Sequence, residues 1–149
     1  MVPVNQKGHR GKYSNSQVGK YNLKNPEKYQ GQLPLIYKSK LERAFMSYLD
    51  HNKKIAVWSY EPMYIFYLDK SSNPPVKRKY YIDFTFKDIT GKKYWVEVKH
   101  SSEVNVDLKK ADPQAIKIWK KNQSKWNAAK LLAESKGCSF NIITEKQLR

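Results

Sequence analysis

The chain has 149 residues and carries 29 Lys and Arg against 13 Asp and Glu, a formal net charge of +16 at pH 7. The length supports a single domain. No run of about 18 apolar residues occurs, so no membrane span is predicted. Cys138 is the only cysteine, so an internal disulfide is excluded. The charge favours a polyanionic partner such as nucleic acid, because each phosphate neutralised by Lys or Arg releases counterions; a surface kept basic for solubility or for anionic lipid is the alternative.

The first 33 residues are basic and show neither helical nor strand periodicity. Six Lys or Arg side chains stand against one acid, Glu27. We interpret residues 1–33 as an extended basic N-terminal arm that becomes ordered on a partner. Three tyrosines spaced by eight residues, Tyr13, Tyr21 and Tyr29, are interpreted as anchors that dock the arm onto the domain, with stacking on a partner as the alternative.

A helix is predicted to begin after Ser39. Serine is a favoured N-cap residue, and the apolar side chains that follow it recur at helical spacing. This apolar stripe consists of Leu41, Ala44, Phe45, Tyr48 and Leu49. We expect the stripe to face the core and the helix to end at the polar residues 50–52.

Two short strands and a loop are predicted next. Residues 55–58 and 63–68 are rich in β-branched and aromatic side chains, and Pro62 between them indicates an edge or a bend. The stretch 69–79 contains two consecutive prolines and is predicted to be a loop. It ends on a basic run of three residues, 77–79.

The clearest sheet signal is a hairpin formed by residues 80–87 and 93–99. A short linker that contains Gly91 joins the two runs, which is typical of a β-hairpin. If the chain folds back about Thr90, residues whose numbers add up to about 180 lie opposite each other. The hairpin therefore predicts that Asp83 and Glu97 are cross-strand neighbours.

A long helix and a last strand complete the chain. Asp112 and Pro113 supply an N-cap and a first-turn proline, and Gly137 marks the stop after about Lys136. The side chains expected on its buried side are Trp119, Trp126, Ala129 and Leu132 or Ala133. With a strand over 139–144, the element order indicates a mixed α/β layer fold for residues 34–149.

A candidate catalytic centre lies in the predicted hairpin. Glu97 and Lys99 are two apart on one strand, so both project from the same face, with Asp83 opposite. Facing carboxylates repel each other unless a cation lies between them, and oxygen ligands suit Mg²⁺ or Mn²⁺. The Lys99 ammonium could orient an attacking water or stabilise charge on a phosphate. A surface ion pair is the alternative, although charges within apolar strands are costly without a purpose.

Two further acids are ambiguous. Ser39 and Glu42 have the spacing of a capping box, in which Glu42 would bond back to the Ser39 amide. Periodicity alone favours this role over a place in the catalytic centre. Glu61 is a further acidic candidate for which a structural role is the favoured interpretation.

Several basic residues are candidates for DNA contact. They are Lys77, Arg78, Lys79, His100, Lys117, Lys120, Lys121 and Lys125. For His100 an ordinary surface position is the alternative, and for the four lysines of the long helix it is a solvated face. The predominance of Lys over Arg suits contact with the backbone better than bidentate recognition of guanine.

These residues resemble the PD-(D/E)XK nuclease superfamily, and more closely the head-completion nucleases of T-even-type bacteriophages. The superfamily pattern is carried by Ile82-Asp83 and Glu97-Val98-Lys99, with Glu42 on an upstream helix; Ile82 stands where the superfamily has proline. The similar stretches are 11–13, 24–31, 36–43, 58–61, 81–84 and 140–145.

The resemblance implies a restriction-endonuclease-like core, a mixed central sheet flanked by helices. It implies that Asp83, Glu97 and the Val98 carbonyl hold Mg²⁺ or Mn²⁺, that Lys99 is the catalytic lysine and that Glu42 completes the site. The expected activity is that of a DNA endonuclease that trims packaged DNA during phage head completion in the host cytoplasm. Association with the virion is a further expectation, and portal or head–tail connector proteins are the expected partners. A non-catalytic DNA-binding connector and a repair or restriction-like nuclease are the alternatives.

Overall fold

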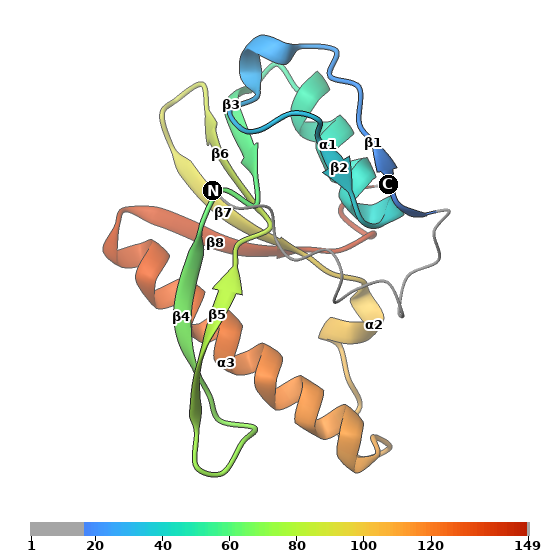
Figure 1. The fold of residues 1–149 in the computed structure, drawn as a ribbon, viewed down its shortest axis with the longest axis vertical. Helices are drawn as coiled ribbons and strands as arrows, with labels where there is room; N and C mark the ends of the chain where they lie inside the picture. The colour runs from blue at the N-terminus through green and yellow to red at the C-terminus, as the bar shows by residue number, and fades with distance from the viewer. Residues whose placement is uncertain (1–16, 149) are drawn as a thin grey trace.

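The computed structural model describes residues 17–148, which build a four-stranded sheet in the order β3-β6-β7-β8 (Figure 1). The strands are β3 (Ile55–Tyr60), β6 (Phe84–Asp88), β7 (Lys93–Val98) and β8 (Cys138–Ile143). Their pairs are antiparallel except for β7 and β8, which run parallel. The predicted mixed sheet is therefore confirmed.

The two long helices begin at the N-caps that the sequence predicts. The Ser39 hydroxyl accepts a hydrogen bond from the Glu42 amide, 3.1 Å, at the start of α1 (Lys40–His51). Asp112 accepts from the Ala115 amide, 2.8 Å, at the start of α3 (Pro113–Ser135), and the helix stops before Gly137, whose φ is +76°. Helix α3 connects β7 to β8, since parallel neighbours need a crossover.

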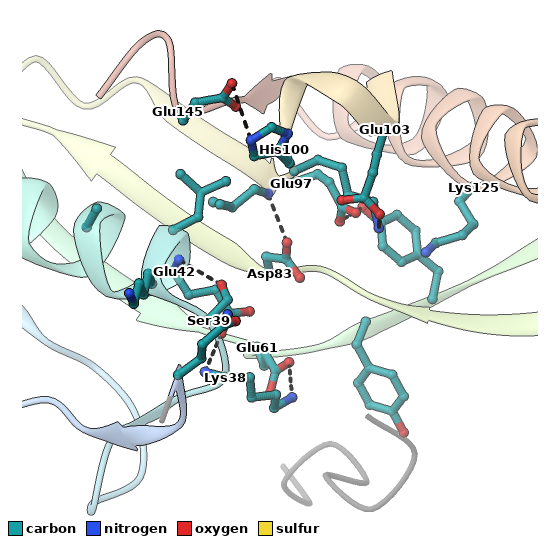
Figure 2. Close-up of a pocket in the computed structure, with 18 of the residues that line it drawn as sticks. Lys38, Ser39, Glu42, Glu61, Asp83, Glu97, His100, Glu103, Lys125 and Glu145 are labelled. Carbon is teal, nitrogen blue, oxygen red and sulfur yellow. Dashed lines mark hydrogen bonds and ion pairs between the residues drawn. The ribbon is translucent and has the colours of Figure 1, made fainter. Parts of the chain in front are cut away.

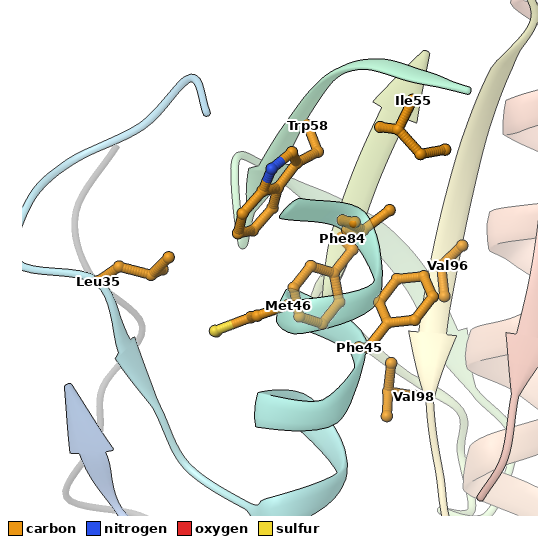
Figure 3. Close-up of a cluster of buried hydrophobic side chains, with 9 residues drawn as sticks. Leu35, Phe45, Met46, Ile55, Trp58, Phe84, Val96 and Val98 are labelled. Atoms are coloured by element: carbon orange, nitrogen blue, oxygen red, sulfur yellow. The ribbon is translucent and has the colours of Figure 1, made fainter. Parts of the chain in front are cut away.

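The sheet core has two sides, one for each long helix, and Figure 3 shows the side that packs under α1. Alternation along β7 sends Val96 into the cluster under α1 and Trp95 into the cluster under α3. The cluster under α1 contains Leu35, Phe45, Met46, Leu49, Ile55, Trp58, Phe84, Val96 and Val98. The cluster under α3 contains Ile65, Tyr67, Tyr80, Ile82, Trp95, Trp126, Ala129 and Ala133.

Helix α1 is rotated slightly from the orientation that the sequence predicts, whereas α3 has the predicted orientation. On α1, Met46 is fully buried while Ala44 and Tyr48 are exposed, so the buried face lies to one side of the predicted stripe. On α3, Trp126 and Ala133 are buried as expected. Trp119 is only half-buried, because it lies beyond the end of the core, in a shallow cavity beside β4.

The structure corrects the loop predicted for residues 69–79. A separate antiparallel ribbon is formed by β4 (Tyr64–Asp69) and β5 (Val76–Tyr81), so the turn is confined to residues 70–75. The predicted strand 80–87 is consequently two strands, β5 and β6. The chain changes pairing partner at Ile82 and Asp83, where the Ile82 amide donates to the Met63 carbonyl and the Asp83 carbonyl accepts from the Glu61 amide.

Residues 17–37 lie against α1 and β3 and contain β1 (Gly19–Lys20), a short 3-10 helix, η3 (Pro26–Lys28), and β2 (Ile36–Tyr37). The predicted docking of tyrosines is confirmed for Tyr21, which donates to buried Asp50 at 2.9 Å, and for Tyr29, whose ring packs on Trp58.

Tyr13 and the rest of the arm to residue 16 lie outside the described residues.

After β7 comes the one-turn helix α2 (Ser101–Val104). No helix within residues 17–148 is long and apolar enough to cross a membrane.

Candidate functional site

The four predicted catalytic residues line one cavity of about 780 Å³. Lys99 lies just after β7. Figure 2 shows the three acids, with Glu42 on α1, Asp83 before β6 and Glu97 on β7. Residues that lie 57 positions apart in the sequence are thus brought together by the sheet. Four of the proposed DNA contacts on other elements, Arg78, Lys79, Lys121 and Lys125, also line this cavity, as does His100.

The β6–β7 hairpin places Asp83 opposite Glu97, as predicted. Phe84 pairs with Val96, and the same register carried one residue outward aligns Asp83 with Glu97. Asp83 Oδ2 accepts a hydrogen bond from the Val98 amide at 2.9 Å, and Glu97 Oε1 accepts from the Tyr80 hydroxyl at 2.6 Å. Glu97 is 4% exposed, so this hydroxyl fixes a carboxylate that solvent barely reaches.

Glu42 does more than cap its helix. Its backbone amide donates to the Ser39 hydroxyl. In the predicted capping box its carboxylate would accept from the Ser39 amide, but in the structure it accepts from the amide of the preceding residue, Lys38. Glu42 Oε1 accepts from the Lys38 amide at 2.7 Å and from the Tyr60 hydroxyl at 3.0 Å. These two bonds turn the carboxylate towards the end of β3, where the other acids lie.

Glu61 joins this cluster, although the sequence favoured a structural role for it. It follows β3 with a φ of +48°, a left-handed conformation that few non-glycine residues adopt, and its amide donates to the Asp83 carbonyl at 2.7 Å. Its carboxylate binds the Lys38 ammonium at 2.7 Å, with both side chains about a tenth exposed. The only sequence signal was an acid between a predicted strand and Pro62.

Lys38 organises two acids at once, which nothing in the sequence pattern indicated. Its amide holds Glu42 while its ammonium holds Glu61 (Figure 2). Within the described residues, Glu42, Glu61 and Asp83 form a group whose ligand oxygens all lie within 4.8 Å of one another. Glu97 is not part of this group, although the sequence paired it with Asp83.

Burial, and after it the charges of neighbouring acids, raises the pKa values of this group. Burial, together with the charge of Glu61, raises the pKa of Glu42 to about 7, against the lowering effect of the Lys38 amide. Burial and the charges of Glu97 and Glu42 raise the pKa of Asp83 well above its usual range. Three hard oxygen donors that resist ionising together are a donor set that fits a divalent cation such as Mg²⁺ or Mn²⁺.

Cationic groups face the acids across the cavity. The Lys125 ammonium lies 4.7 Å from the centre of the Tyr80 ring; burial lowers its pKa while the charge of Glu97 raises it. Lys99 Nζ lies 3.9 Å from Glu103 Oε1 of α2, and the Lys99 amide bonds to the Ile143 carbonyl of β8. A site with clustered acids on one side and ammonium groups on the other can bind a cation and a phosphate together.

The remaining basic candidates occupy different surroundings. Arg78 donates to buried Asp69 at 2.7 Å, which ties its guanidinium to the ribbon. His100 caps α2 and lies 3.6 Å from Glu145. Lys77 and Lys117 do not line the main cavity, and Lys120 lines the smaller one beside Trp119.

Comparison with known proteins gives two matches. A family described as TnsA-like endonuclease N terminal matches residues 52–145, which contain Glu61, Asp83, Glu97 and Lys99. The chain is also 35% identical over 141 residues to the head completion nuclease of Enterobacteria phage T4, a match that covers 88% of this chain and 93% of the relative.

Proposed function

Because the chain belongs to the TnsA-like endonuclease family, we propose that it is a metal-dependent deoxyribonuclease that acts in phage head completion. The observation that carries this proposal is the convergence of Glu42, Glu61, Asp83, Glu97 and Lys99 on one cavity of a chain with a net charge of +16. The name of the phage T4 relative supports the role in head completion.

The proposed centre divides the work among these side chains. Asp83, with Glu42 and Glu61 beside it, would hold Mg²⁺ or Mn²⁺, and Glu97 and the Val98 carbonyl are the further ligands that the sequence proposed. A cation held there supplies Lewis-acid stabilisation of a phosphate oxygen. The Lys99 ammonium would neutralise charge that develops on the phosphate as a water oxygen bonds to phosphorus, the bond to the leaving oxygen breaks and that oxygen takes up the water proton.

The protein scaffold keeps these groups in place before substrate arrives. Tyr80 fixes Glu97, Tyr60 fixes Glu42, and the Val98 amide fixes Asp83. Pre-positioned groups of this kind avoid reorganisation during the reaction. The proposed DNA contacts on the rim are Lys79, Lys121 and Lys125 with Arg78 and His100, and beyond the rim Lys77, Lys117 and Lys120.

The proposed setting is the host cytoplasm during phage assembly, with DNA as substrate and portal or head–tail connector proteins as partners. The name of the phage T4 relative is the support for this setting. The alternative, a DNA-binding connector without activity, predicts the same DNA affinity but no hydrolysis.

Cleavage of supercoiled plasmid tests the proposal. The wild-type protein is expected to nick or linearise plasmid with Mg²⁺ or Mn²⁺ and to stop when EDTA is added. Asp83→Asn and Lys99→Gln should each lower the rate at least about 100-fold, the usual effect of removing one charge-stabilising group. Both should still retain DNA in a binding assay.

Matched controls use exposed residues of the same types. Asp107→Asn and Lys130→Gln change exposed side chains outside the cavity and should cleave at the wild-type rate. Normal cleavage by both Asp83→Asn and Lys99→Gln would show that the centre lies elsewhere. Wild-type binding without any cleavage would favour the connector.

A further inference from the structure

The β4–β5 ribbon has two unlike faces. Alternation sends Ile65, Tyr67 and Tyr80 inward, where they are buried with residues of α3. The register pairs Tyr64 with Tyr81, Phe66 with Lys79 and Leu68 with Lys77. These six residues share the other face, which we call the outer face of the ribbon.

The outer face is apolar and cationic together. Tyr64, Phe66 and Leu68 are 41%, 51% and 49% exposed, a high share for side chains of this size. Lys77 and Lys79 are exposed beside them, and no carboxylate occurs among the six residues. A bare apolar surface would favour a protein partner, but the two ammonium groups make a polyanion the better fit.

Each lysine of this face is held over an aromatic ring. Lys77 Nζ lies 4.3 Å from the centre of the Phe66 ring, and Lys79 Nζ lies 4.5 Å from the centre of the Tyr64 ring. Both pairs are diagonal neighbours across the two strands. Cation–π contacts of this kind restrict a flexible side chain before a ligand binds.

The spacing of the lysines suits a DNA backbone. Two residues of an antiparallel strand advance about 6.8 Å, so Lys77 and Lys79 are far enough apart to contact separate phosphates of one strand, which carries a charge about every 3.4 Å along the duplex axis. Lys79 also lines the catalytic cavity, whereas Lys77 lies two residue pairs farther out along the ribbon. The outer face therefore extends outward from the edge of the site.

We propose that the outer face of the β4–β5 ribbon is a docking surface for duplex DNA, with Lys77 and Lys79 on phosphates of one strand. The inference rests on the proposed nuclease function and says where the substrate lies beyond the cavity. The ring faces already carry ammonium groups, so stacked bases of single-stranded DNA would have to displace them. The apolar rings line the path beside the phosphates and hold the lysines in place.

Fluorescence anisotropy with a labelled 20-base-pair duplex in EDTA, at a series of salt concentrations, tests the docking surface. The double variant Lys77→Gln/Lys79→Gln should lose roughly 10- to 60-fold in affinity at 0.1 M salt, and the slope of log K against log salt should fall by about 1.8, for two phosphate contacts. The control Lys130→Gln/Lys136→Gln removes the same charge from exposed positions outside the cavity and should change the slope little.

The variant Phe66→Leu tests the contribution of the aromatic ring to DNA affinity separately from that of the two lysine charges. It keeps the charge and most of the apolar volume, so the salt slope should stay at the wild-type value while affinity falls about two- to fivefold. An unchanged slope in the double lysine variant would overturn the proposal. So would a loss confined to a single-stranded probe of equal length, which would point to base stacking instead.

The same proteins keep this inference separate from the proposed function. If the wild type binds the duplex through the ribbon but cuts no plasmid with Mg²⁺ or Mn²⁺, the nuclease proposal fails and the docking surface stands. If the wild type cuts and the double lysine variant binds and cuts equally well, only the docking surface fails.

Discussion

Replacement of Glu42 by glutamine should stabilise the metal-free protein at alkaline pH. Burial and the charge of Glu61 raise the pKa of Glu42 from its ordinary value of 4.5 to about 7. The folded state therefore holds a proton that the unfolded chain releases near pH 4.5, so stability falls as the pH rises from 4.5 to 7. The raised pKa corresponds to roughly 3 kcal/mol lost above pH 7.

Glutamine keeps the useful contacts of this side chain and removes the charge. Its amide oxygen can still accept from the Lys38 amide and the Tyr60 hydroxyl, as Glu42 Oε1 does. For a chain of this length, about 3 kcal/mol raises the midpoint of thermal unfolding by roughly 6–12 °C. We expect this gain at pH 8 in EDTA and almost none at pH 4.5.

Thermal unfolding with and without divalent cation completes this test. A cation at 100 times its dissociation constant should stabilise the wild type by about 2.7 kcal/mol, and Glu42→Gln by less, because one negative ligand has gone. Glu134→Gln, an exposed change on α3, should behave as the wild type. A lower midpoint for Glu42→Gln at pH 8 in EDTA, or an unchanged dependence on pH, would refute the reasoning.

Three further predictions follow from other contacts. Lys38→Met leaves the buried carboxylate of Glu61 without the Lys38 ammonium and should destabilise the protein by roughly 3–5 kcal/mol at pH 8 in urea unfolding. The double variant Lys38→Met/Glu61→Gln should recover most of this loss. No recovery would rule out the Lys38–Glu61 ion pair as the cause. Hydrogen bonds from Ser101 lower the pKa of Glu145 to about 2, so the ionised Glu145 stabilises the fold above pH 4.5 and this stabilisation is lost as the pH falls towards 2. Glu145→Gln should therefore show a smaller decline in thermal midpoint over that range than the wild type. An equal decline in both proteins would contradict the assignment. Phe84→Ala empties the centre of the cluster under α1, where Phe84 is fully buried, and should cost about 3–5 kcal/mol; a loss under 1 kcal/mol in urea unfolding would mean that the cluster collapses to fill the gap.

Local patterns predicted the elements whose signals lie within a few residues. The caps at Ser39 and Asp112 and the stop at Gly137 set the ends of α1 and α3, because a helix end depends on the amides and carbonyls of its own first and last turns. The turn about Thr90 set the register of β6 and β7, and strand alternation then placed Asp83 against Glu97.

The junction between β5 and β6 was beyond such patterns. Apart from Asp83, residues 80–86 are all aromatic or β-branched, and strand propensity gives no sign that pairing changes within them. The break appears only because β5 pairs with β4 and β6 pairs with β3, with Ile82 and Asp83 at the change of partner. The pairing partners, not the propensity of residues 80–86, decide where β5 ends and β6 begins.

The sequence by itself determined the pair Asp83 and Glu97, the place of Lys99 beside them, and the charge that favours DNA. The tertiary structure decided the rest of the centre. Glu42 follows the rule for a helix cap, and the sequence alone preferred that role. Only packing of α1 against the end of β3 brings it to Glu61, with Lys38 between them. The physical reason is that hydrogen-bonded turns and strand alternation act over a few residues, whereas the mutual repulsion of three acids arises only when the folded core brings them within 4.8 Å.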